Sequence, residues 1–115
     1  MATSIIKTNY KRGTVTPNGN VDTTNVIVIQ EGRTITVNGY VRNVNITSNA
    51  YTKLFEISNV NLPREAIRLL CEVADEPHLH PQDVCYGVLN DVGGFWIVSN
   101  ISATKSVWFS FSYNI

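Results

Sequence analysis

The amino-acid sequence predicts an all-β domain, an antiparallel β-sandwich or barrel of about eight or nine short strands. Valine, isoleucine and threonine number 14, 11 and 11 residues, against 6 leucines, 5 alanines and 1 methionine. β-Branched side chains fit a pleated sheet better than a helix. Short apolar stretches also recur along the whole chain, separated by glycine, asparagine and proline, so no helix of useful length is required.

The pattern divides the chain into an N-terminal lead-in over residues 1–25 and a β-sandwich or barrel domain over residues 26–115. The lead-in holds a possible strand from Ile5 to Tyr10. A turn follows at Thr16–Asn20, where a proline and a glycine supply the backbone dihedral angles that a turn needs.

The first strands of the domain differ in their hydrophobic pattern. Val26–Ile29 is an unbroken apolar run, which indicates a central strand covered on both faces. Thr34–Val41 alternates between apolar and polar residues, as in a strand with one buried face. Gly39 lies inside this alternation, so we interpret it as a bulge or a site of close packing and not as a hairpin turn. The polar stretch Asn43–Tyr51 is predicted to be a loop.

The middle of the chain contains one ambiguous segment. Thr52–Ile57 reads as a strand. In Arg64–Val73 the apolar residues fit both helical spacing and alternation, and we favour a strand that begins at Ile67. Asp75–Gln82 contains two prolines and two histidines, which predicts a long exposed loop.

The C-terminal part shows the clearest hairpin. Strands are predicted at Val84–Leu89 and Phe95–Val98, around a turn at Asn90–Gly94. The last strand, Val107–Tyr113, places its apolar residues on one face and Trp108, Ser110 and Ser112 on the other. Because the chain has no heptad pattern, any oligomer must form through the β domain itself.

Charge and composition exclude several classes of partner. The formal net charge is zero and only 16% of residues are charged, so no long-range field attracts nucleic acid or an anionic membrane. No apolar run approaches the ~18 residues of a membrane span, and we recognise no export signal. The 13 asparagines, 11 threonines and 8 serines offer uncharged hydrogen-bonding groups that suit polyol ligands.

The sequence favours binding over catalysis. The only histidines are His78 and His80, and no strained Gly-x-Ser-x-Gly turn presents a nucleophile. Acidic residues are present, but nothing selects a pair for glycoside cleavage. We therefore expect no enzyme and no cofactor.

Metal binding is an alternative that the sequence leaves open. The imidazoles of His78 and His80 would lie on one side of an extended segment, spaced for one ion or, in a trimer, for three pairs around an axis. A structural zinc site needs two more ligands, and Cys71 and Cys85 lie in apolar stretches where they pack inward, so we favour a plain polar loop. We expect the two thiols to be buried and unbonded.

Exposed loops on a rigid β scaffold commonly carry binding groups. An exposed indole can also stack on a pyranose ring, but Trp96 and Trp108 lie beside apolar residues, so we favour a core or subunit-interface position for both. The candidate ligand-binding residues are Asp75, His78, His80, Asp83 and Trp96.

The order of these features resembles the receptor-binding head domains at the tips of bacteriophage tail fibres and baseplate proteins, as in phages of lactococci and related bacteria. The matching elements are Arg33–Val41, Leu54–Ile57 followed by Asn61–Pro63, Val84–Leu89, Gly93–Val98 and Val107–Tyr113.

This resemblance implies a homotrimeric β-barrel or sandwich of the virion, associated with other tail or baseplate proteins. It also implies that the domain binds host cell-wall saccharides in its loops or in clefts between protomers. Such heads usually follow a stalk, whereas Met1 precedes this domain almost directly, which suggests a head fragment or a short tail protein. The alternatives are a structural tail or capsid accessory protein and a free lectin-like carbohydrate-binding module.

Overall fold

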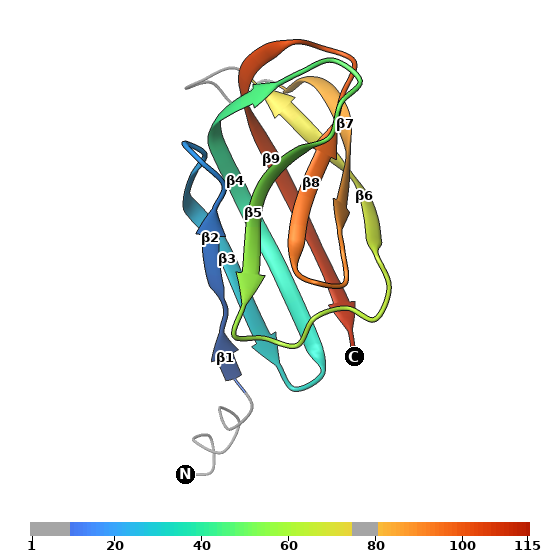
Figure 1. Cartoon of the computed structure of the whole chain (residues 1–115). Helices are drawn as coiled ribbons and strands as arrows, with labels where there is room; N and C mark the ends of the chain where they lie inside the picture. Colours follow the sequence, from blue (N-terminus) through green and yellow to red (C-terminus); the bar gives the residue numbers. More distant parts are fainter. Residues whose placement is uncertain (1–9, 75–80) are drawn as a thin grey trace.

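Nine antiparallel strands form a nearly closed barrel, which confirms the predicted fold class (Figure 1). The computed structural model describes residues 10–74 and 81–115, with the backbone alone for residues 81–83. The strands are β1 (Tyr10–Arg12), β2 (Thr14–Pro17), β3 (Asp22–Glu31), β4 (Thr34–Ile46), β5 (Thr52–Ser58), β6 (Ile67–Ala74), β7 (Pro81–Leu89), β8 (Gly94–Val98) and β9 (Ala103–Asn114).

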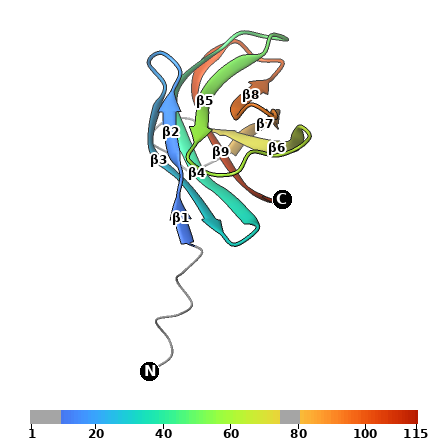
Figure 2. The same ribbon diagram turned by 60° about the horizontal axis from the view of Figure 1, so that its bottom comes forward.

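The N-terminal strands close the barrel. The strand order is β1-β3-β4-β9-β6-β7-β8-β5-β2, so the two ends of the sheet are consecutive pieces of one segment. Figure 2 shows this segment running between β3 and β5. Between β1 and β2, the Gly13 N–H donates to the Val28 carbonyl at 2.8 Å. A Cβ atom on Gly13 would lie 2.7 Å from Val28 Cγ1, so the crossing requires glycine.

The described part of the predicted lead-in therefore belongs to the barrel. β1 and β2 are hydrogen-bonded to β3 and β5, and β3 begins at Asp22, so no boundary falls at residue 26. The turn expected at Thr16–Asn20 is present but begins later, because Thr16 and Pro17 belong to β2. The Val21 N–H donates to the Asn18 carbonyl at 3.3 Å, and Gly19 has a φ of 60°. Most of the possible strand Ile5–Tyr10 lies outside the described residues.

Aromatic side chains fill the centre of the barrel. The Phe95 ring on β8 lies 5.1 Å from that of Phe55 on β5 and 5.0 Å from that of Phe109 on β9, measured between centroids. Phe55 and Phe95 are fully buried, and tilted aromatic contacts at this distance add to the apolar area removed from water. Opposite walls of the barrel thus meet through three rings.

Two expectations for β3 and β4 were wrong. Val26–Ile29 is not covered on both faces, because Ile27 points outward with 43% of its surface exposed while Val28 is buried. The predicted loop from Asn43 begins as strand: β4 continues to Ile46, and both Val44 and Ile46 are buried. Asn43 adopts a φ of 63° at an irregularity in the register with β9. The alternation of buried and exposed residues shifts there by one residue, so the sequence pattern does not reveal that the strand continues.

Other predictions for single segments are confirmed. β6 begins at Ile67 as a strand. Gly39 is a site of close packing, because it has a φ of 132° and a Cβ atom there would lie 2.0 Å from the Asn25 carbonyl oxygen. The alternation of the last strand also holds, with Val107, Phe109 and Tyr113 buried.

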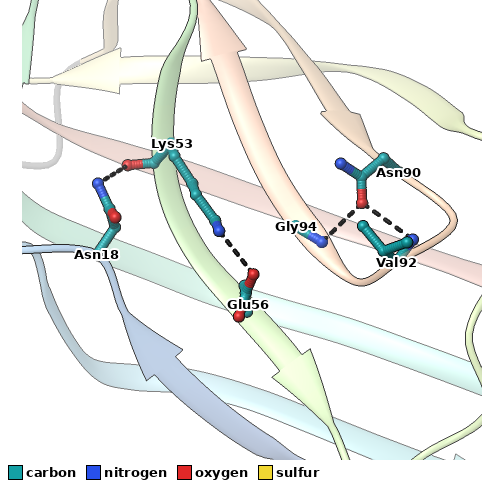
Figure 3. A network of polar contacts seen from close by, with 6 residues as sticks. All are labelled: Asn18, Lys53, Glu56, Asn90, Val92 and Gly94. Atoms are coloured by element: carbon teal, nitrogen blue, oxygen red, sulfur yellow. Dashed lines mark hydrogen bonds and ion pairs between the residues drawn. The ribbon is translucent and has the colours of Figure 1, made fainter.

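The predicted β7–β8 hairpin is held by the side chain of Asn90. Its Oδ1 accepts hydrogen bonds from the backbone N–H groups of Val92 at 3.1 Å and Gly94 at 2.8 Å (Figure 3). An asparagine that bonds to its own turn fixes the hairpin without a salt bridge. On β5, the strand beside β8, an ion pair of 2.6 Å joins the side chains of Lys53 and Glu56 (Figure 3).

A network of hydrogen bonds attaches the connection between β5 and β6 to the barrel. Gln30 and Asn61 exchange two hydrogen bonds of 2.9 Å, from Gln30 Nε2 to Asn61 Oδ1 and from the Asn61 N–H to Gln30 Oε1. The Tyr113 hydroxyl donates to the Asn61 carbonyl at 2.6 Å. The connection between β5 and β6 is thereby tied to β3 and β9. Burial raises the pKa of Tyr113 to about 12.

We expect Gly39→Ala to destabilise the fold by about 3 kcal/mol or more, because the methyl group meets a backbone oxygen and the residue must keep a positive φ. Gly19→Ala is the matched control, with a φ of 60° and open space around the added atom, and should cost about 1 kcal/mol. Urea unfolding of both variants measures the difference. Equal losses would contradict the close packing at Gly39.

Tyr113→Phe should reduce stability by about 1–2 kcal/mol at pH 8 by removing the hydrogen bond to Asn61. Because folding raises the Tyr113 pKa from 10.0 to about 12, the tyrosine's advantage is fully present below pH 10 and is lost as the pH rises toward 12. Parallel urea unfolding of both proteins at several pH values tests this. A difference that stays constant from pH 8 to pH 11.5 would contradict the buried neutral phenol.

Candidate binding site

One row of side chains crosses the outer surface of five strands. Antiparallel pairing sets Asn25 beside Tyr40, Tyr40 beside Trp108, Trp108 beside Glu72 and Glu72 beside Val84. Directly opposed residues on one face of a sheet have Cβ atoms close enough to interact. We call these five residues the outer row. It brings together residues that are up to 83 positions apart in the chain.

A cleft opens beside the outer row because β6 and β9 separate. Among the described residues the two strands pair at three positions, and the pairing stops at Glu72 and Trp108. From there, β9 continues along β4 while β6 continues along β7. The β6–β9 cleft has a volume of about 750 Å³, and Asn38, Leu70 and Ser110 line it together with the outer row.

An aromatic pair lines the cleft on the β4–β9 side. The rings of Tyr40 and Trp108 stack with centroids 4.1 Å apart and an angle of 22° between their planes. Both side chains are half-buried. The Arg42 guanidinium lies 5.5 Å from the Tyr40 ring centre, and its Nη2 donates to the Tyr40 hydroxyl at 3.3 Å. These contacts hold the pair in one orientation.

Polar side chains surround the aromatic pair. Asn25, Asn38, Glu72 and Ser110 are exposed. Among the interactions within the described residues, none engages these four side chains. They offer amide donors, amide and carboxylate acceptors and a hydroxyl group to a ligand in the cleft. The site therefore combines an aromatic pair with uncommitted hydrogen-bonding groups.

The residues predicted from the sequence fall elsewhere. Asp75, His78 and His80 lie outside the described residues. Asp83 is on β7 opposite Val73, at a position where the backbone alone is described.

Trp96 does not join the cleft. It lies on the outer side of β8, half-buried, and pairs with Lys53 of β5. The Lys53 Nζ atom is 5.8 Å from the centre of the Trp96 ring. Both tryptophans are half-buried on the outer face of the sheet, so the expectation of a core position was wrong, and that of a subunit interface stays a prediction.

Sequence reasoning missed Tyr40 and Trp108 as a site. Alternation did place Tyr40 with Asn38, and Trp108 with Ser110, on the outer faces of their strands. What it lacked was the register between β4 and β9, which these residues share across 68 positions of sequence. A search for outward aromatic residues flanked by asparagine or serine would have found both.

The two cysteines are buried, unbonded thiols, as predicted, and Cys71 lines the cleft. Cys71 and Cys85 are directly opposed on β6 and β7. The hydrogen bond with Cys85, together with burial, raises the pKa of the Cys71 thiol, which keeps it protonated and unreactive. Within residues 10–74 and 81–115, no group of three or more histidine, cysteine, aspartate or glutamate side chains could hold a metal ion.

Within the part of the chain that is described, no helix has the length and apolar character needed to cross a bilayer. Comparison of the chain with models of protein families, with curated proteins and with solved structures finds no match.

Proposed function

We propose that this chain is a non-catalytic host-adhesion domain of a phage tail or baseplate, which binds a cell-surface saccharide in the β6–β9 cleft. The observation that carries the saccharide part is the stacked Tyr40–Trp108 pair in an open cleft with unengaged polar side chains. The phage setting follows from the sequence resemblance.

The chemistry of a pyranose ring fits this arrangement. Its C–H groups form an apolar face that is attracted to the negative face of an aromatic ring. Its hydroxyl groups both donate and accept hydrogen bonds, and Asn25, Asn38 and Ser110 can do the same. Zero net charge suits a neutral polyol, since no long-range attraction is needed.

Binding at one such site would be weak, because the cleft is open and surrounds a sugar on one side only. Several copies on one particle would raise the overall strength of attachment without new contacts. The homotrimer implied by the resemblance is one such arrangement. It stays a prediction, as do the association with other tail proteins and the location in the virion.

Trp108→Ala should weaken saccharide binding at least about tenfold, because it removes the stacking surface from the cleft. Trp96→Ala is the matched control: it deletes the other half-buried, outward tryptophan, which lies outside the cleft. A glycan array of bacterial cell-wall oligosaccharides identifies a ligand. Titration calorimetry with that ligand then compares the two variants with the unmodified protein.

Three results of this comparison have different meanings. Selective loss in Trp108→Ala supports the proposal. Equal affinity in all three proteins, or selective loss in Trp96→Ala, contradicts the assignment of the site. If the unmodified protein binds no glycan on the array, a structural tail component becomes the better interpretation.

A further inference from the structure

The outer face of β6 and β7 carries a second feature that the saccharide site does not explain. Leu70, Val84 and Tyr86 expose 63%, 56% and 68% of their surface. Contiguous exposed apolar residues with polar neighbours are typical of a protein–protein contact. We call the six outward residues of the two strands the β6–β7 face: Arg68, Leu70, Glu72, Val84, Tyr86 and Val88.

The residues of this face are arranged in three parallel rows. Strand pairing sets Arg68 beside Val88, Leu70 beside Tyr86, and Glu72 beside Val84. The middle row is apolar, and both of its side chains are exposed. A positive charge precedes it on β6 and a negative charge follows it, so that Arg68 and Glu72 are four residues and about 13 Å apart. Among the described residues, neither charge has an ion-pair partner.

This pattern is complementary to itself under a two-fold rotation. Consider a second copy facing the first, with the axis in the contact plane, perpendicular to the strands and level with the middle row. The rotation reverses the strand direction, so each copy's Arg68 faces Glu72 of the other copy. Leu70 then meets Leu70, Tyr86 meets Tyr86, and Val84 meets Val88. Every position finds a matching group, as a two-fold interface requires.

Other arrangements of the same face match less well, including a trimer built on it, so this pair is an alternative to the homotrimer that the resemblance implies. If three copies met around an axis parallel to the strands, Arg68 residues would lie at one level and Glu72 residues at another. Like charges would then face each other, which opposes association. An axis parallel to β6 and β7 in a pair would set Arg68 against Val88 and leave the charge without a partner.

We propose that the β6–β7 face is a two-fold interface with a second copy of this chain, centred on Leu70 and Tyr86 and closed by two reciprocal Arg68–Glu72 ion pairs. The contact goes beyond saccharide binding. Leu70, Glu72 and Val84 also line the β6–β9 cleft, whereas Arg68, Tyr86 and Val88 do not, so the two surfaces overlap at one edge. The face is small, so the pair forms and separates as the protein concentration changes.

Charge reversal tests the reciprocal pairing. Arg68→Glu gives each copy two negative charges at these positions, and Glu72→Arg gives two positive charges. Each variant alone should associate at least about tenfold more weakly than the unmodified protein. An equimolar mixture of the two variants restores both ion pairs, and so does the double variant with both substitutions. Arg64→Glu, an equal charge change at an exposed position outside the face, is the matched control.

Sedimentation equilibrium over about a hundredfold range of concentration measures the mass of each sample. The expected result is twice the 12.8 kDa of one chain at high concentration for the unmodified protein, the control, the mixture and the double variant. The separate Arg68→Glu and Glu72→Arg samples should remain at 12.8 kDa. Circular dichroism melting of each variant confirms that it is folded.

Any of three results would overturn the interface. The unmodified protein could remain at the mass of one chain throughout. It could form a trimer whose mass is unaffected by the charge changes. Finally, the mixture of the two single variants could fail to associate. Because Trp108→Ala leaves the β6–β7 face intact, loss of saccharide binding in that variant without loss of the pair separates this interface from the proposed function.

Discussion

The short pairing of β6 with β9 is the constraint on which the rest of the structure depends. Within residues 10–74 and 81–115, three residue pairs join the half of the barrel built on β3, β4 and β9 to the half built on β6, β7 and β8. With fewer pairs the barrel would open on this side. With more, the strands would run together and the cleft beside Trp108 and Glu72 would close. The same three pairs set the Tyr40–Trp108 stack next to an acidic and an apolar side chain.

Barrel closure on the other side has a different basis. There the N-terminal segment leaves β3, passes the tight contact of Gly13 with Val28, and continues along β5. A continuous barrel hides the backbone groups of its edge strands, which limits pairing with other chains through the sheet edge. Contact with partners is left to side chains on the outer face, where both the cleft and the β6–β7 face lie.

Local patterns predicted most strands, while the site depends on register. Alternation was sufficient for β4, β6 and β9, because one buried face leaves a period of two in the sequence. It failed at Asn43, where a bulge shifts the alternation by one residue. It also failed at Val26–Ile29, because apolar side chains on the outward face made the sequence look like a strand buried on both faces. Tyr40, Trp108 and Glu72 become neighbours only through three-dimensional pairing, so no local signal could unite them.

The most direct test of the saccharide site is a ¹⁵N–¹H NMR titration that follows the two indole N–H signals. A panel of neutral and amino hexoses at high concentration serves as ligand, since weak binding still shifts resonances in fast exchange. We predict that at least one sugar shifts the Trp108 indole signal in a saturable manner and leaves that of Trp96 unchanged. Shifts confined to Trp96, or no saturable shift of the Trp108 signal with any sugar, would contradict the site.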